Sequence, residues 1–165
     1  MSFKAYRISP EKYATDISGS GAKLVGGRWN PKGVALLYTS TTAALAALEV
    51  LVHVEWNLLP PLSLVEITVR KNAILDLQDL PRASSTDPIF LPDGWTRNPP
   101  HPSLSTIGKQ WVESSASVGL LVPSVFFPEG PDQNLLLNPI HPDFDKDTKI
   151  TKVNPFSFDD RLRKV

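Results

Sequence analysis

One segment limits the fold of this chain more than any other: residues 43–56, AALAALEVLVHVEW, are apolar almost without interruption. Thr41 and Thr42 stand directly before it, and either can cap a helix that begins there. A helix that is apolar on nearly all sides should be buried on most faces. The chain has 165 residues, which is long enough to supply such a core. The segment therefore predicts a buried helix with Glu49 in its middle.

The segments around this helix are short and of mixed type. Six of them are expected to form strands, at 4–8, 34–40, 62–69, 73–77, 119–125 and 134–137. Residues 62–69 alternate between apolar and polar positions, which indicates an antiparallel strand with one solvated face. Residues 107–117 are expected to form an amphipathic helix. Strands and helices do not alternate regularly, so the predicted fold class is α+β.

Glycine and proline residues indicate where the loops of the chain lie. Glycines at 19, 21, 26 and 27 indicate a flexible loop before Arg28. The chain holds 16 prolines, and many of them fall in its second half. Residues 81–104 are rich in proline, serine and glycine, which predicts a long surface loop. The tail, 150–165, is expected to add an edge strand and a loose end, and residues 1–165 to form a single domain.

Composition excludes several classes of function. Lys plus Arg and Asp plus Glu number 17 each, so there is no basic surplus of the kind that DNA binding usually needs. The chain has no cysteine, which excludes disulfides, thiolate catalysis and cysteine-ligated metals. The N-terminal residues do not resemble a signal peptide, and no stretch is apolar enough to span a membrane. We expect a cytoplasmic protein without direct nucleic-acid or membrane contacts.

Glu49 is the first candidate for chemistry, because a carboxylate in apolar surroundings is costly unless it is paired or hydrogen-bonded. The pattern alone leaves open whether Glu49 is functional or an exposed residue where the apolar stripe breaks. His53 lies one helical turn further on, at a spacing that allows a hydrogen bond with Glu49. No further metal-ligand spacing accompanies this pair, so we expect no metal site.

Two other positions invite a ligand. Arg28 follows two glycines, which let a backbone approach a ligand closely, and its guanidinium can bind phosphate through two donors. Tyr38 and Ser40 end a predicted strand just before the helix that carries Glu49. A surface turn at Arg28 and an ordinary core tyrosine at Tyr38 remain open alternatives. Ser124 lacks the G-x-S-x-G setting of a hydrolase nucleophile.

Taken together, five blocks in order resemble the RES-domain family: GGRWNPKG, YTS, ALAALEVLVH, LLVPSV and LLLNPIHPDF. The resemblance runs from about Tyr6 to Phe144, while the loop 81–104 and the tail match nothing in it. The arginine, glutamate and serine that name the family correspond to Arg28, Glu49 and Ser124. The resemblance implies a fold like that of ADP-ribosyltransferases, with mixed sheets, a buried helix and peripheral helices.

The resemblance also implies an activity, the cleavage of the nicotinamide–ribose bond of NAD by hydrolysis or phosphorolysis. NAD would be the substrate, with no resident cofactor. The implied site contains Arg28, Tyr38, Glu49 and Ser124, with Arg7 and Asn138 as further substrate contacts. Glu49 would stabilise positive charge on the ribose, as carboxylates do in glycoside cleavage.

The other implied residues would bind rather than react. Arg28 and Arg7 would hold the pyrophosphate, Tyr38 would pack on the nicotinamide or its ribose, and Ser124 would donate a hydrogen bond. Transfer of ADP-ribose to a protein, or a binding module without turnover, are the alternatives. Members of the family are toxins restrained by Xre-type antitoxins, so we expect such a partner to cover or enter the pocket, and a homodimer within the complex.

Overall fold

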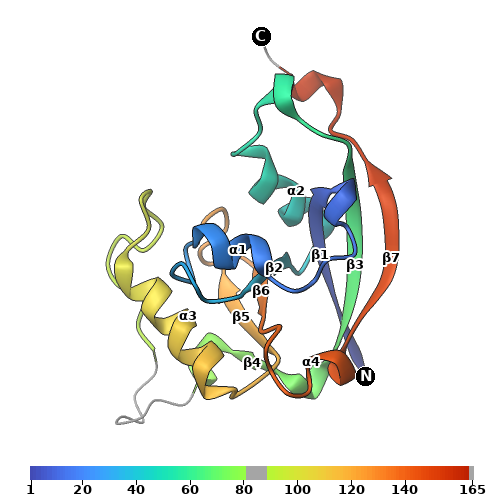
Figure 1. Ribbon diagram of the computed structural model, residues 1–165. Coiled ribbons are helices and arrows are strands. Elements are labelled where there is room, and N and C mark those ends of the chain that lie inside the picture. The colour runs from blue at the N-terminus through green and yellow to red at the C-terminus, as the bar shows by residue number, and fades with distance from the viewer. Residues whose placement is uncertain (81–88, 164–165) are drawn as a thin grey trace.

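A seven-stranded mixed sheet organises the part of the chain that the computed structural model describes, residues 1–80 and 89–163. The strands are β1 (Ser2–Pro10), β2 (Leu37–Ser40), β3 (Leu62–Arg70), β4 (Ile74–Asp76), β5 (Gly119–Pro123), β6 (Gln133–Leu137) and β7 (Thr148–Phe156). They lie in the order β4-β5-β6-β2-β1-β3-β7, and all neighbours are antiparallel except β4 and β5. Figure 1 shows β7 along one outer edge and α3 on the opposite side of the molecule. The predicted α+β class is confirmed.

Four α-helices and five 3₁₀ helices accompany the strands in the described part of the chain. The α-helices are α1 (Ser20–Val25), α2 (Ala43–Leu51), α3 (Pro102–Ser114) and α4 (Phe144–Asp147). Short 3₁₀ turns are η1 (Glu11–Tyr13), η2 (Trp56–Leu58), η3 (Lys71–Ala73), η4 (Leu77–Asp79) and η5 (Asp160–Leu162). Within residues 1–80 and 89–163, none of these helices has the length and apolar character needed to cross a bilayer.

Both faces of β6 are buried, and this divides the core into two clusters. Leu135 and Leu137 pack with Val65 of β3 in one cluster, whereas Leu136 packs with Trp111 of α3 in the other. Successive residues of a strand point to opposite faces, so three consecutive leucines serve both clusters. Each of the three leucines is 0% exposed.

The sheet has a seam between β1 and β2. β1 pairs with β3 along its whole length, from Ser2 opposite Arg70 to Pro10 opposite Leu62. With β2 it pairs at one position, Tyr6 opposite Ser40. α2 packs against both β1 and β2, so this helix bridges the seam.

The expectation of a buried helix at 43–56 is wrong in two respects. α2 begins at Ala43, capped by Thr42, whose hydroxyl accepts a hydrogen bond from the Leu45 N–H (3.2 Å), but it ends at Leu51. Beyond Leu51 the valines alternate through the sequence, and β-branched side chains lose rotamer freedom in a helix. Within α2 only Leu45 and Ala46 are buried and Ala44 is exposed, while the remaining residues are half-buried where the helix packs against β1 and β2.

The bounds of other helices and loops also differ from those expected from the sequence. The helix expected at 107–117 is α3, which starts earlier because Pro102 occupies its first turn and His101 caps it by accepting from the Ser103 N–H (3.2 Å). The glycine-containing segment expected to be a loop contains α1. Residues 89–101 form the described part of the loop expected at 81–104, and residues 81–88 lie outside the described chain. β7 is the expected edge strand.

Candidate functional site

The loop that presents Arg28 is a tight turn. The Gly27 N–H donates to the Asn30 carbonyl (2.8 Å), and Gly26 has a φ of +78°, which favours glycine. A Cβ atom at Gly27 would lie 2.6 Å from the Tyr38 hydroxyl. The two glycines therefore allow the turn to close directly against β2.

Tyr38 holds this turn through its hydroxyl. The hydroxyl accepts from the Trp29 N–H (2.9 Å) and donates to Asn30 Oδ1 (2.7 Å). Burial raises the pKa of Tyr38 above its ordinary value. The hydroxyl thus remains protonated and engaged with the loop, while the aromatic ring packs against the core cluster that contains Trp29.

Arg28 points from this turn toward Glu49 and toward the loop before α3. Its Nη1 donates to the carbonyls of Trp95 (2.7 Å) and Arg97 (3.2 Å). Burial lowers the pKa of Arg28, and the nearby Glu49 and Tyr38 groups act in the opposite direction. A guanidinium has five N–H donors in a fixed fork, so two carbonyls on one nitrogen leave donors available to an anion.

Glu49 is half-buried in the last turns of α2. Its Oε1 accepts two hydrogen bonds, one from Asn134 Nδ2 (2.6 Å) and one from Ser124 Oγ (3.3 Å). His53 is exposed, and the predicted Glu49–His53 hydrogen bond does not form in the structure. These two hydrogen bonds offset the cost of placing the Glu49 carboxylate in apolar surroundings.

Ser124 follows β5 directly and is 0% exposed. Its Oγ also accepts from the Phe126 N–H (3.2 Å), which fixes the hydroxyl while its proton is directed to Glu49. In the β5–β6 register Val122 pairs with Asn134, so Ser124, two residues further on, is a diagonal neighbour of Asn134. Both donors to Glu49 thus come from neighbouring strand ends.

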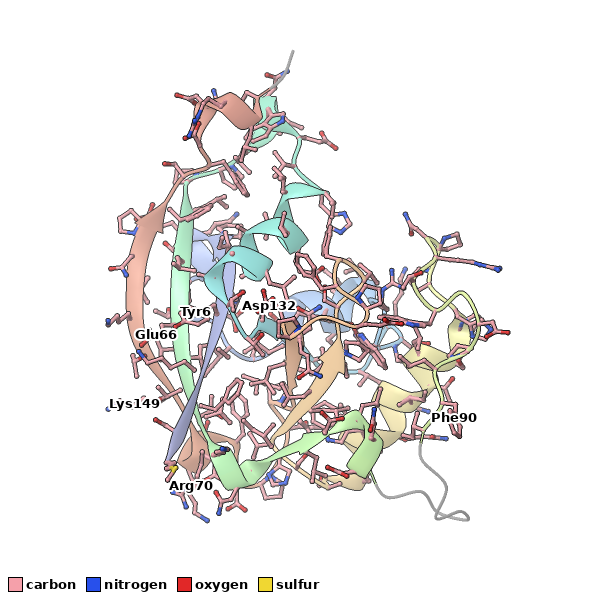
Figure 2. The ribbon with its side chains drawn as sticks, turned by 180° about the vertical axis from the view of Figure 1, so that it is seen from behind. Tyr6, Glu66, Arg70, Phe90, Asp132 and Lys149 are labelled. Carbon is pink, nitrogen blue, oxygen red and sulfur yellow. The ribbon has the colours of Figure 1, made fainter. Side chains whose placement is uncertain are left out.

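Asn134 is a member of this candidate site that the sequence did not indicate. It pairs with Ser40 in the β2–β6 register, and the Ser40 hydroxyl donates to its Oδ1 (2.8 Å). Nearby, Asp132 lies beside the start of α2 (Figure 2), where the Thr42 hydroxyl donates to it (3.5 Å). The only sequence signal was a polar residue at the start of an otherwise apolar strand, next to the equally polar end of β2.

Two of the expected substrate contacts donate their side-chain hydrogen bonds to backbone carbonyls rather than to this cluster. Arg7 donates through Nη1 to the Asp16 carbonyl (2.5 Å), and burial lowers its pKa while Asp16 acts in the opposite direction. Asn138 is 0% exposed, and its Nδ2 donates to the Val112 carbonyl of α3 (3.1 Å). It follows β6 at the end away from Asn134, about 13 Å along the strand at about 3.3 Å per residue.

The site therefore combines one carboxylate, one guanidinium and several neutral donors. In residues 1–80 and 89–163 there is no group of three or more His, Asp or Glu side chains placed to hold a metal ion. Such an arrangement can bind an anionic ligand at Arg28 and stabilise positive charge near Glu49.

Comparison with known proteins identifies the family to which the chain belongs. The sequence model described as "RES domain" matches residues 4–159. The chain belongs to the RES-domain family. The resemblance that the five sequence blocks indicated is thereby confirmed, and Arg28, Glu49 and Ser124 meet in one site of the RES domain.

Curated relatives of this RES-domain chain are toxins. It is 43% identical over 150 residues to a protein of Sphingobium sp. named "Prs ADP-ribosylating toxin", covering 90% of this chain and 88% of that one. It is 41% identical over 164 residues to "Toxin Res" of Photorhabdus laumondii, covering 97% of each chain. It is 39% identical over 162 residues to "Toxin Res" of Yersinia enterocolitica, covering 96% and 98%.

A solved structure shares the fold. The "M. tuberculosis MbcT-MbcA toxin-antitoxin complex" contains a chain that matches with a TM-score of 0.64 and 20% identity, covering 95% of this chain and 85% of that one. Nearly the whole RES domain thus has a counterpart in that toxin–antitoxin structure.

Proposed function

We propose that this RES-domain protein is the toxin of a toxin–antitoxin pair and that it consumes NAD by cleaving the bond between nicotinamide and ribose. The observation that carries the proposal is the Glu49 carboxylate, held by Asn134 and Ser124 and facing the Arg28 guanidinium. The curated relatives named as toxins support the role.

The reaction suits these groups. When the C1′–N bond breaks, its electron pair goes to the nicotinamide ring nitrogen, which thereby becomes neutral. The ribose carbon left behind carries positive charge, which the Glu49 carboxylate stabilises. Water then attacks C1′ and releases a proton, giving ADP-ribose, or phosphate attacks the same carbon and gives ADP-ribose phosphorylated at that carbon. Because the leaving group is already cationic in NAD, the site needs no thiol or histidine to protonate it.

Binding falls to the other side chains. The free donors of Arg28 bind the pyrophosphate, and Ser124 serves as a hydrogen-bond donor and not as a nucleophile. Tyr38 holds the Arg28 turn with its hydroxyl, while its ring packs against the core cluster that contains Trp29. Arg7 uses Nη1 for the Asp16 carbonyl and, like Arg28, has further donors on its guanidinium with which to bind the pyrophosphate.

The test measures free nicotinamide after incubation of purified protein with NAD. We expect release by the wild type and a loss of at least about 100-fold in kcat for Glu49→Gln, which keeps the shape and removes the charge. Glu55→Gln is the matched control, because Glu55 is an exposed carboxylate just beyond the same helix. Equal rates for wild type and Glu49→Gln would refute the mechanism, and runs with and without phosphate separate phosphorolysis from hydrolysis.

A second activity is supported by the Sphingobium relative, whose name describes ADP-ribosylation of Prs. In this version a nucleophile of a target protein replaces water at C1′. NAD labelled in its adenine would then leave label on a macromolecule, whereas hydrolysis leaves it in free ADP-ribose.

An antitoxin partner is supported by the toxin–antitoxin complex that shares the fold. We propose that this partner is of the Xre type and covers the Glu49–Arg28 site, and that the toxin forms a homodimer within the complex. Co-expression with the neighbouring reading frame should restore growth, and light scattering of the purified complex measures its stoichiometry. Growth arrest that persists under co-expression would contradict the partner assignment.

A further inference from the structure

The orientation of the Asn134 side-chain amide follows from its two neighbours. A carboxylate only accepts hydrogen bonds, so the amide atom 2.6 Å from Glu49 Oε1 is the NH₂ group. The amide oxygen then faces Ser40, whose hydroxyl donates to it at 2.8 Å. Ser40 is 3% exposed, and its backbone is fixed by pairing on both sides, with Tyr6 of β1 and Asn134 of β6. The sheet therefore determines which end of the amide reaches the carboxylate.

The hydrogen bonds to Glu49 are divided unequally between its oxygens. Asn134 and Ser124 both donate to Oε1. In the described part of the chain, Oε2 receives no hydrogen bond. One oxygen is thus anchored to two strand ends, and the other retains its lone pairs for a ligand.

We propose that Asn134 is a positioning residue for NAD cleavage, which anchors Glu49 through Oε1 and thereby presents Oε2 to the ribose. The inference rests on the proposed function. Charge stabilisation is effective when the charged group is already oriented before the transition state forms. Glu49 is half-buried on α2, and the two strand ends fix its Oε1 through the hydrogen bonds from Asn134 and Ser124. Oε2 accepts from the ribose 2′-hydroxyl while the positive charge develops at C1′.

The first variant is Asn134→Ala, assayed by nicotinamide release. We expect kcat to fall about 10- to 100-fold, less than for loss of the carboxylate itself, while KM for NAD changes by less than about threefold. The Arg28 contacts do not involve Asn134, so binding of the pyrophosphate is retained. Ser40→Ala should lower kcat in the same direction by a smaller factor, because it frees the amide to rotate.

The second variant, Asn134→Asp, separates positioning from simple packing. It places a second carboxyl group within hydrogen-bond distance of Glu49, and the like charge makes one of the two groups take up a proton at a higher pH than an isolated carboxyl would. We expect kcat to fall as the pH is lowered, and this fall to begin at a higher pH than in the wild type and Asn134→Ala. Asn154→Asp, on the exposed part of β7, is the control for the same chemical change.

Each outcome decides between two ideas. Wild-type kcat in Asn134→Ala, or matching pH profiles for the Ala and Asp variants, overturns the positioning role while the proposed function stands. No nicotinamide release by the wild type overturns the proposed function and the positioning role with it. Circular dichroism of each variant establishes that it is folded, and if Asn134→Ala does not fold, Ser40→Ala with its KM and kcat decides.

Discussion

Removing only the hydroxyl of Tyr38 tests whether this residue acts by holding the Arg28 turn. In Tyr38→Phe the ring stays in the core, but the Trp29 N–H loses its acceptor and Asn30 Oδ1 loses its donor. Trp29 is 2% exposed and Asn30 is 1% exposed, so water does not readily replace either partner. The variant therefore leaves two polar atoms unsatisfied in the interior.

The size of the effect follows from those two atoms. Each buried group left without a partner costs about 1–3 kcal/mol. Asn30 keeps its Nδ2 bonds to the carbonyls of Ala22 and Val34, both at 2.9 Å, so the residue stays anchored. We therefore expect the free energy of unfolding to fall by about 2–4 kcal/mol, toward the lower part of the combined range. This is a large fraction of the stability of about 5–15 kcal/mol that is typical of native proteins.

Urea denaturation followed by tryptophan fluorescence measures this change, because Trp29 and Trp111 are both buried. With a denaturant slope of about 1–3 kcal/mol/M, the unfolding midpoint should fall by roughly 1–2 M. Tyr13→Phe is the control, since Tyr13 is half-exposed and the change should stay within about 0.5 kcal/mol. A Tyr38→Phe variant as stable as this control would refute the role assigned to the hydroxyl.

Three further variants probe the core, the turn and the β3–β7 edge. Trp111→Ala should destabilise the protein by about 3–5 kcal/mol in the same urea assay, because the indole fills the core beneath α3; a loss below about 1 kcal/mol would contradict this. Gly27→Ala should raise KM for NAD, since its Cβ would lie 2.6 Å from the Tyr38 hydroxyl and displace the turn; an unchanged KM counts against the role of the turn. The Thr151 hydroxyl, which donates to Glu66 (2.9 Å), holds the pKa of that carboxyl below its ordinary value, so the bond stabilises the fold above the unfolded pKa and is lost as pH falls. The stability difference between wild type and Glu66→Gln should therefore be greatest above about pH 5 and shrink below about pH 4, and a difference independent of pH would be inconsistent with this linkage.

Local patterns predicted the parts of the fold that local forces determine. Thr42 marked the start of α2, and the alternation in β3 identified its apolar face. The other face is not solvated as expected, because Glu66 is only 9% exposed and Thr68 is half-buried. The end of α2 and the partial exposure of most of its residues were not predictable in this way, because they depend on where the helix lies against β1 and β2. Pro102 is a sequence signal for the start of α3, but the proline-rich composition of the preceding residues led to the prediction of a loop there.

The candidate site likewise contains residues that sequence blocks indicate and residues that only strand pairing brings together. Arg28, Glu49 and Ser124 stand in recognisable blocks, and the structure brings them together. Asn134 required knowledge that β2 pairs with β6, a register that joins residues more than 90 positions apart. Asn138 stood in an equally recognisable block, yet the same register directs it to the opposite end of β6, where it bonds to α3.

The seam between β1 and β2 has a mechanical consequence. With Tyr6 opposite Ser40 as their pairing, the two halves of the sheet depend on α2 and on the hydrogen bonds of Glu49 to stay in register. A molecule bound between Glu49 and Arg28 would link α2, which packs against β1, to the loop that precedes β2. Occupancy at a hundredfold excess over Kd adds about 2.7 kcal/mol to the stability of the folded state. Any ligand that binds both residues would in this way also hold the two halves of the sheet together.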